Sequence, residues 1–364
     1  MRRFSESLKN KMEIKQLLQL AVDRLASDLH IIAGIPPHLR VEGELFPIPD
    51  EVPITPEMVN KSVKEILIPE QLERLTVNKE IDFSLPFNQN ARFRVNAYTQ
   101  KNSYAIAFRR IPLEIPEIDK LGLPKILHSF TGLRQGFILV TGPTGHGKST
   151  TLAAMLNEIN ENRACHIITI EDPIEFIFKP KRSIISQREM GFDTHSWQIA
   201  LRSVLREDPD VVLVGEMRDY ETIASALTVA ETGHLVFATL HTNSAAQTID
   251  RIVDVFPEEQ QEQVKLQLSN VVEAVFSMRL VPSVSGKRVV GYEVMLGTSA
   301  IKTSIREGKT HQIDNILQTS TEVGMNTLEM SLAELVGNGK LDMETAQSFS
   351  LRPEELLRLI RSSK

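Results

Sequence analysis

Residues Gly142–Ser149 have the sequence Gly-Pro-Thr-Gly-His-Gly-Lys-Ser, which matches the phosphate-binding pattern Gly-x-x-x-x-Gly-Lys-[Ser/Thr]. The glycines let backbone amides curl around phosphate oxygens, and the amino end of a following helix adds partial positive charge. In this pattern Lys148 reaches the β- and γ-phosphates, and the Ser149 hydroxyl ligates magnesium. The strand pattern FILVT precedes the loop and the helical pattern STTLAAMLNEI follows it, so the sequence predicts a site for ATP and Mg²⁺. The predicted nucleotide-binding residues are Gly142, Pro143, Thr144, Gly145, His146, Gly147, Lys148, Ser149 and Thr150.

An acid follows the apolar run Val211–Gly215, which has the pattern of a buried strand. In phosphate-loop enzymes such a strand lies beside the loop and presents a carboxylate to magnesium or to the attacking water. Gly215 occupies the usual position of that acid, and the acid here is Glu216, 68 residues after Lys148. Glu216 is therefore the predicted activating base and a predicted magnesium residue, with Glu175 or Glu171 as the alternative base.

Two further polar segments are expected at the same sheet edge, because the carboxyl ends of parallel strands share one side. Glu171, Asp172 and Glu175 come just after the run HIITI. Acids near a bound phosphate repel it unless magnesium intervenes, so they predict metal and water positioning; a solvated acidic loop is the alternative. The run LVFATL has His234 before it and His241 after it, and His241 is expected near the γ-phosphate unless its role is structural.

Four arginines gather on one predicted hairpin outside the phosphate-loop region: Arg92, Arg94, Arg109 and Arg110. Phosphate-loop enzymes often recruit an arginine from elsewhere to neutralise the transition state, and Arg94 and Arg109 are the candidates for this role. A polar sheet face without catalytic function is the alternative. A loop histidine such as His146 is more often a solvated filler than a catalyst.

The first region that must position these residues spans 12–111 and has the pattern of a small α+β domain, preceded by a polar extension at 1–11. Apolar residues recur at three and four through 12–26, which predicts an amphipathic helix that uses Leu25 on its apolar face. Short strand patterns fill 29–49. In the stretch 91–111 apolar and polar residues alternate, which predicts a hairpin with one apolar face.

The second region, 125–364, has the pattern of an α/β domain with a helical C-terminal part. Three prolines lie in 111–124, so residues 112–124 are assigned to a linker. Downstream, the runs FILVT, HIITI, VVLVG and LVFATL alternate with helical patterns around 148–160, 195–206, 219–232 and 244–255. Continuous apolar strands separated by helices indicate a buried, mostly parallel sheet.

Composition narrows the class of protein further. The chain has 364 residues and a formal charge of −6, which disfavours a nucleic-acid partner. A single cysteine, Cys165, excludes a disulfide framework and a cysteine-rich zinc ribbon. No apolar run approaches the ~20 residues that cross a bilayer, and the basic N-terminus lacks the apolar segment of a secretory signal. A cytoplasmic protein is expected, associated with a membrane only through its partners.

Five motifs in order give the chain a specific likeness: ARFRVNAY, GPTGHGKSTTLAAM, TIEDPIEF, REDPDVVLVGEMRD and ETGHLVFATLHTNSA. Together with ASDLHIIAGIPPHLRVEGEL they resemble the type IV pilus retraction ATPases (the PilT family) of the secretion-ATPase superfamily. The resemblance implies a PAS-like N-terminal domain, a RecA-like ATPase domain, a homohexameric ring, and ATP hydrolysis that drives pilin removal and twitching motility. It implies a platform protein in the inner membrane as the partner, and a location at the cytoplasmic face of that membrane. It also implies that Glu216 is the catalytic glutamate, that Glu175 belongs to an acidic motif, and that His234 and His241 form a histidine motif.

Two departures from the family pattern concern the loop and the C-terminal part. His146 stands where a small serine is usual, and the backbone-mediated phosphate contacts should tolerate it. The signature AIRNLIRE, associated with retraction, is AIKTSIRE here at 300–307. An ATPase for pilus extension or type II secretion is therefore an alternative, although extension-type relatives carry a four-cysteine metal motif. A nucleic-acid translocase and a non-hydrolysing ATP-gated scaffold are the more distant alternatives.

Overall fold

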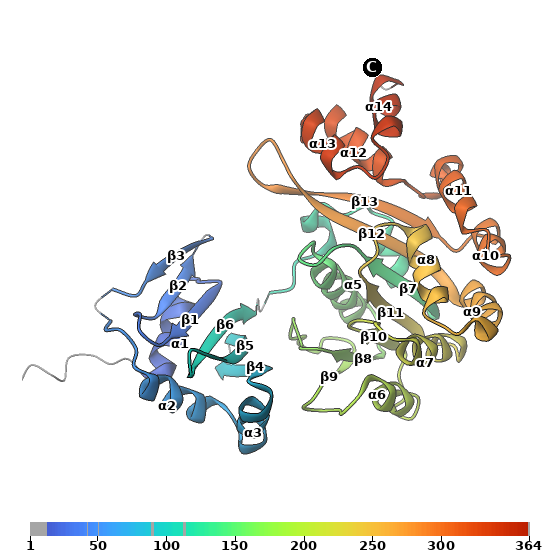
Figure 1. Ribbon diagram of the computed structural model, residues 1–364. Helices are drawn as coiled ribbons and strands as arrows, with labels where there is room; N and C mark the ends of the chain where they lie inside the picture. The colour runs from blue at the N-terminus through green and yellow to red at the C-terminus, as the bar shows by residue number, and fades with distance from the viewer. Residues whose placement is uncertain (1–12, 42, 50, 89–90, 112–113, 363–364) are drawn as a thin grey trace, which may run out of the picture. The chain divides into compact units, whose positions relative to one another are not determined.

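The computed structural model describes residues 13–41, 43–49, 51–88, 91–111 and 114–362. They form two compact units (Figure 1). The first contains Met1–Glu114 together with Pro173–Ile177, and the second contains Ile115–Asp172 and Phe178–Lys364. The predicted extension at 1–11 lies outside the described residues.

The first unit is built on a six-stranded antiparallel sheet in the order β3-β2-β1-β6-β5-β4. The strands are β1 Asp28–Ile32, β2 His38–Val41, β3 Glu44–Pro47, β4 Glu80–Asn88, β5 Ala91–Gln100 and β6 Ser103–Ile111. The helices are α1 Ile14–Asp23, α2 Pro56–Ile66 and α3 Pro69–Asn78. Buried side chains of these helices share one core with every second residue of the hairpin strands, among them Phe93 and Val95.

The predicted hairpin at 91–111 is confirmed. Phe93, Val95 and Ala97 are buried in β5 and alternate with half-buried polar residues. The turn residues Lys101 and Asn102 both have a positive φ, of +45° and +59°. A two-residue turn with this backbone conformation matches the right-handed twist of the two antiparallel strands that it joins.

The predicted helix at 12–26 is shorter than its apolar pattern. α1 ends at Asp23, and Leu25 takes a left-handed φ of +52° with its side chain 72% exposed. The amide of Ala26 donates to the carbonyl of Ala21, so the chain reverses through a C-terminal cap instead of continuing the helix. The expectation that Leu25 lies on the apolar face is therefore wrong.

The second unit contains a seven-stranded sheet in the order β13-β12-β7-β11-β10-β8-β9. Its strands are β7 Gly136–Thr141, β8 His166–Glu171, β9 Ile184–Glu189, β10 Val211–Val214, β11 Leu235–Leu240, β12 Val272–Pro282 and β13 Arg288–Leu296. All pairs are parallel except β12 with β13. Every residue of β7, β10 and β11 is buried, which confirms the predicted buried parallel sheet.

The helices of the second unit confirm the four helical patterns and continue to the end of the described chain. The helices that match the four predicted patterns are α5 Lys148–Asn162, α6 Trp197–Val204, α7 Tyr220–Glu231 and α8 Ala245–Asp254. The others are α4 Leu127–Thr131, α9 Glu258–Val271, α10 Ser299–Arg306, α11 Ile313–Thr319, α12 Leu328–Gly337, α13 Met343–Phe349 and α14 Pro353–Ser362. In Figure 1, α12–α14 lie beside the β12–β13 ribbon, and Leu328 and Leu332 share a small apolar cluster with Val281 of β12.

The last part of the segment assigned to a linker belongs to the second unit. It forms a short 3₁₀ helix at Ile118–Leu121, and Ile118 is buried. His128 of α4 joins it to α5: its Nε2 lies 3.1 Å from Asp119 Oδ1 and its Nδ1 lies 2.7 Å from Glu158 Oε2. The hydrogen bond to Asp119, followed by that to Glu158, raises the pKa of His128 above its ordinary value.

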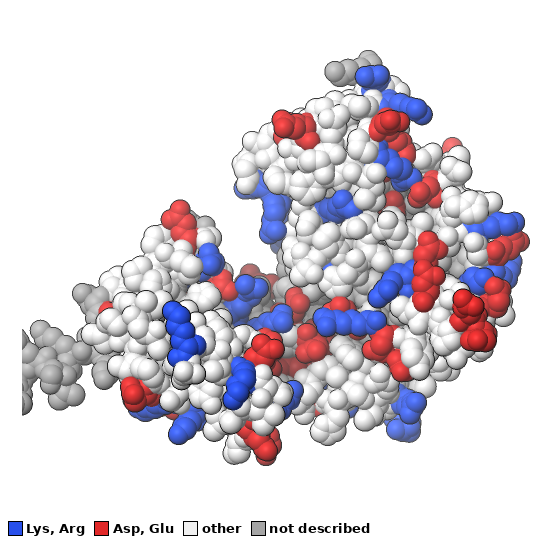
Figure 2. All heavy atoms as spheres, viewed as in Figure 1, with Lys and Arg blue, Asp and Glu red and all other residues white. Residues whose placement is uncertain are grey.

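The surface of the described residues carries both signs of charge. On the face shown in Figure 2, acidic and basic side chains are interspersed over both units. No helix in the described ranges is long and apolar enough to cross a membrane.

Candidate active site

The phosphate loop joins β7 to α5 and depends on glycine at both ends. Gly142 has φ +141°, and a side chain there would collide with the carbonyl oxygen of Met278 on β12. Gly147 has φ +93° and precedes Lys148, the first residue of the 15-residue helix α5. Ser149 is the second residue of that helix. The loop amides and the hydroxyls of the first helical turn therefore lie together at a helix amino end, which suits a phosphate group.

Lys148 is held inside the loop. Its side chain is buried, and Nζ donates to the carbonyl oxygens of Gly142 at 2.7 Å and Pro143 at 3.0 Å. Nζ also lies 3.4 Å from Nδ1 of His241, and the Thr144 hydroxyl lies 3.2 Å from the same nitrogen. The loop and the end of β11 are thus in direct contact.

His241 connects the loop to Glu216. Its Nε2 lies 3.0 Å from Glu216 Oε1, on the side of the ring opposite to Lys148 and Thr144. The ring therefore lies between the phosphate loop and the carboxylate, with Nδ1 toward Thr144 and Lys148 and Nε2 toward Glu216. His241 lies beside the phosphate loop, and its proximity to the γ-phosphate stays a prediction.

Arg218 is a site residue that the sequence analysis missed. Its Nε and Nη2 donate to the two carboxylate oxygens of Glu216 at 2.8 and 2.9 Å. This bidentate pair, followed by the positive charges of Arg218, His241 and Lys148, lowers the pKa of Glu216 below its ordinary value despite partial burial. Glu216 is therefore held ionised and fixed in place, which suits the orientation of a water molecule more than the uptake of its proton.

Gly215, which precedes Glu216, packs closely against β8. A Cβ at Gly215 would lie 3.1 Å from the carbonyl oxygen of Ile170 and 3.2 Å from Cα of Glu171 on β8. The Thr239 hydroxyl also donates to the Gly215 carbonyl oxygen. A side chain at this position would require β8 to shift slightly, so the close packing favours glycine here, and the acid lies one residue later.

His146 has a defined structural contact and is not a solvated filler. Its Nδ1 accepts a hydrogen bond from the backbone amide of Leu280 on β12 at 3.0 Å. Burial, followed by the positive charges of Arg279 and Lys148, lowers the pKa of His146. The ring is therefore neutral at neutral pH and fastens the loop to β12.

The acidic segment divides between the two units. Glu171 ends β8 in the second unit, is buried, and accepts from the Thr169 hydroxyl at 2.6 Å and from Gln187 at 3.4 Å. Glu175 lies in Pro173–Ile177, which belongs to the first unit. Its role as a magnesium residue stays a prediction.

His234 lies at the opposite edge of the sheet from the loop. It precedes β11, and its Nδ1 contacts the Val229 carbonyl oxygen at 3.0 Å. The six residues of β11 separate it from His241 by about 20 Å. The structure therefore does not bring the two histidines together, and a shared role at the phosphate stays a prediction.

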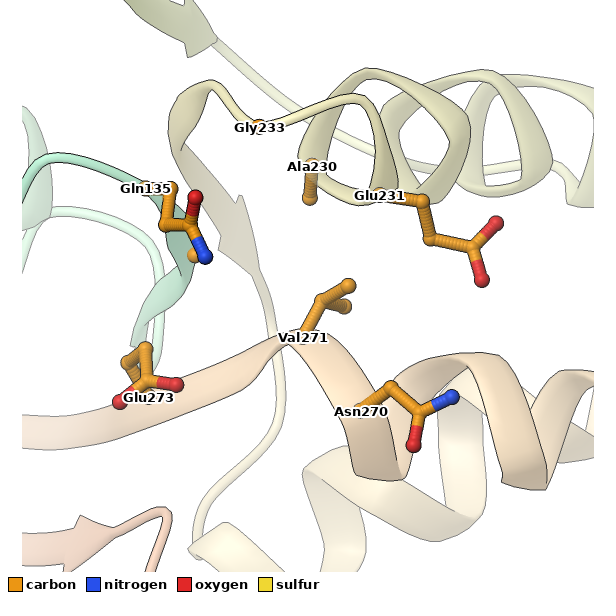
Figure 3. Close-up of a pocket in the computed structure, with 8 residues that line it drawn as sticks. Gln135, Ala230, Glu231, Gly233, Asn270, Val271 and Glu273 are labelled. Atoms are coloured by element: carbon orange, nitrogen blue, oxygen red, sulfur yellow. The ribbon is translucent and has the colours of Figure 1, made fainter.

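That edge of the sheet also holds a pocket of about 280 Å³ (Figure 3). Its lining residues are Gln135, Gly136, Ala230, Glu231, Gly233, Asn270, Val271 and Glu273. The only charged members are acids, which repel phosphate, so this pocket is not the nucleotide site.

Arg94 and Arg109 are directly opposite each other on β5 and β6 of the first unit. Arg109 Nε donates to Asp28 Oδ1 at 2.9 Å, and Arg94 Nε lies 3.9 Å from Asp82 Oδ1. Both arginine side chains are more than two-fifths exposed. The pair of Arg94 with the exposed Asp82 therefore stabilises little, whereas Arg109 pairs with the buried Asp28. An approach of either arginine to phosphate stays a prediction.

The fold and the site together define a phosphate-loop ATPase, with a RecA-like domain and a smaller PAS-like α+β N-terminal domain. The sequence profile of the type II/IV secretion system proteins matches residues 6–336, and the chain belongs to this family.

Individual relatives match over almost their whole length. The chain is 46% identical over 343 residues to the type IV pilus retraction ATPase PilT of Pseudomonas aeruginosa, covering 94% of this chain and 99% of that protein. It is 44% identical over 346 residues to the twitching motility protein of Neisseria gonorrhoeae, covering 94% and 92%. A crystal structure of the pilus retraction motor PilT with bound ADP superposes with a TM-score of 0.90 at 45% identity, covering 96% of this chain and all of that one.

The contact between His146 and Leu280 makes the first testable prediction. His146→Ala should weaken nucleotide binding about fivefold, because the loop loses one hydrogen bond to β12. His146→Asn should bind as the parent does, since its side-chain oxygen can accept from the same amide. Titration with a fluorescent nucleotide measures both affinities.

The same contact predicts a pH dependence of the parent protein. Because the folded-state pKa of His146 is lowered, Nδ1 stays free to accept at neutral pH, and the contact is lost only as the pH falls through that lowered value. The Asn variant should lack this loss. Equal acid sensitivity of the two proteins would contradict the assignment.

Proposed function

We propose that this chain hydrolyses ATP and that the hydrolysis powers the retraction of type IV pili, with twitching motility as the result. The observation that carries the proposal is the continuous contact from Lys148 through His241 to Glu216, in a chain that matches the Pseudomonas pilus retraction ATPase over 94% of its length. The protein works as a homohexamer at the cytoplasmic face of the inner membrane, bound to a platform protein in that membrane. Residues 12–111 and 125–364 are the main parts of its two domains, and the later part of the intervening 112–124 packs with the second.

The residues at the loop fit a magnesium–nucleotide complex. Among the described residues, no group of three or more His, Cys, Asp or Glu side chains is arranged to hold a metal ion. Magnesium in nucleotide sites needs only one or two protein ligands beside phosphate and water. Ser149 and Glu216, with Glu175, are the residues that would hold it directly or through water, and the ion would neutralise charge on the phosphates.

The chain's own groups account for the steps around the phosphate. The loop amides and Lys148 bind and orient the triphosphate, and Lys148 exchanges its carbonyl contacts for phosphate oxygens. Glu216 orients the attacking water, while Arg218 and His241 hold its carboxylate in place. Phosphoryl transfer needs positioning and charge stabilisation more than a strong base, so the lowered pKa of Glu216 is compatible with this role.

A charge that neutralises the transition state comes, in this proposal, from Arg94 or Arg109. Both side chains are exposed; Arg94 pairs with the exposed Asp82 and Arg109 with the buried Asp28, and a phosphate would have to displace that partner. The ring would bring one of them to the nucleotide, from the same chain or from a neighbour.

Substitution of Glu216 tests the site. Glu216→Gln should retain nucleotide affinity but lower turnover at least about a hundredfold, because the amide has the same size and lacks the negative charge that orients water. Lys148→Ala serves as the contrasting control, since it should lose affinity as well. Phosphate release and fluorescent-nucleotide titration measure the two quantities; a parallel loss of both in Glu216→Gln would show that Glu216 is structural.

Substitution of the arginines tests the assembled site. Arg94→Ala or Arg109→Ala should lower turnover by about a thousandfold and nucleotide affinity much less. Arg110→Ala is the matched control, because Arg110 is next to Arg109 on β6 but its Nη1 lies near the Val22 carbonyl oxygen of α1. The arginine variant that has lost turnover is then mixed with Lys148→Ala. Recovered activity in the mixed ring would mean that the arginine acts across a subunit interface. Unchanged turnover in both arginine variants would contradict the proposal.

Deletion of the gene tests the direction of pilus work. The strain should retain or accumulate surface pili and lose twitching, and the parent gene, but not the Glu216→Gln variant, should restore it. Electron microscopy and a stab-agar motility assay give the two readouts. A strain without surface pili would instead indicate an ATPase for pilus extension.

A further inference from the structure

Glu293 of β13 is a buried acid that contacts the segment following His241. Its side chain is 1% exposed. Its Oε1 accepts from the backbone amide of Ala245, the first residue of α8, at 2.6 Å. Only the turn 242–244 separates this amide from His241. Glu293 therefore holds, from the side of β13, the helix end to which the active-site histidine is attached.

The other hydrogen bonds of this turn go to α8 itself. The Ser244 hydroxyl accepts from the amide of Gln247 at 3.3 Å, and the hydroxyls of Thr242 and Thr248 are 2.7 Å apart. These bonds fix the shape of the turn relative to the helix. The bond from Ala245 to Glu293 fixes it relative to the sheet, and so relative to Glu216 at the end of β10.

On its other side Glu293 neighbours a charged cluster of the C-terminal helices. Arg352, which precedes α14, lies with Nη1 2.8 Å from Asp314 Oδ2 of α11 and with Nη2 3.2 Å from Glu329 Oε2 of α12. Its Nε is 3.2 Å from Glu355 Oε2. Three acids therefore share one arginine here, and Arg279 of β12 is a further positive charge near Glu293 and Glu329.

This environment makes Glu293 titratable at neutral pH. Burial raises its pKa to about 7, with Asp314 and Glu329 acting in the same direction and the Ala245 amide and Arg352 acting against them. Its Oε2 is buried without a hydrogen-bond partner among the described residues, so this oxygen can take up the proton. An amide at a helix amino end binds a carboxylate more strongly than a neutral acid.

We propose that Glu293 is a positioning residue for ATP hydrolysis: its carboxylate holds the amino end of α8 and thereby keeps His241 against Glu216. The inference rests on the proposed ATPase activity. It also connects the C-terminal helices to the site, because the cluster of Asp314, Glu329 and Arg352 sets the charge on the same carboxylate.

The pH dependence of turnover is the first test. In the parent, kcat should fall about tenfold as the pH is lowered through about 7, because protonation weakens the bond to Ala245. Glu293→Gln keeps the volume and the acceptor oxygen but cannot ionise, so its kcat should lack this inflection and stay near the low-pH level of the parent. Glu273→Gln is the matched control. Glu273 lies on the neighbouring strand β12 and pairs with Lys302 of α10, so its substitution should leave the pH profile of the parent unchanged.

A double-mutant cycle with His241 distinguishes positioning from general stability. Glu293→Ala should lower kcat about tenfold with little change in nucleotide affinity, and this effect should disappear in a His241→Ala background. Thermal unfolding of each variant reports on the fold, and Glu293→Gln remains available if the alanine variant does not fold. A parent protein that releases no phosphate would refute the proposed function. An active parent whose pH profile matches that of Glu293→Gln, or a Glu293→Ala effect that persists without His241, would overturn this inference.

Discussion

The whole site depends on the parallel register of β7, β11 and β10. Leu240 pairs with Thr141, and Val214 pairs with Ala238, so the three strands end at almost the same level. The phosphate loop follows β7 directly and His241 follows β11 directly, while Glu216 follows β10 after Gly215. The strands are buried over their full length, and a shift of one residue would reverse every side chain from one face to the other. The core therefore fixes the relative positions of groups that lie about a hundred residues apart in the sequence.

Close packing of the loop against β12 imposes a second constraint. Gly142 has to be glycine because of the Met278 carbonyl, and His146 reaches the Leu280 amide two residues further along the same strand. The loop is thus supported by its own strand β7 on one side and by β12 on the other. His146 shows how a residue that is unusual for the pattern can be accommodated: it replaces a small polar side chain with one that makes a specific bond to the neighbouring strand.

The sequence predicts the parts of the fold that repeat a strong pattern. The continuous apolar strands, the hairpin and the loop were recognisable, whereas β9 was not, because it is an edge strand with an exposed first residue and half-buried polar ones. Arg218 was also missed, because its contact with Glu216 lies in a segment without regular structure after β10. His234 is close to His241 in the sequence, but the whole length of β11 separates the two side chains. Closeness in sequence is therefore a misleading signal here. Glu293 could not be found from sequence, because its significance comes from a helix end 48 residues away.

The hairpin of β12 and β13 contacts both halves of the site. β12 supports the phosphate loop through Met278 and Leu280, and β13 holds the α8 turn through Glu293. Nine cross-strand residue pairs join the two strands, and α12 packs on the outer part of the ribbon. Because these pairs couple the two strands, a displacement of the outer part of the ribbon would act on the nucleotide loop and the His241 turn together. The ribbon therefore gives the C-terminal helices a mechanical lever on nucleotide binding and water orientation at once.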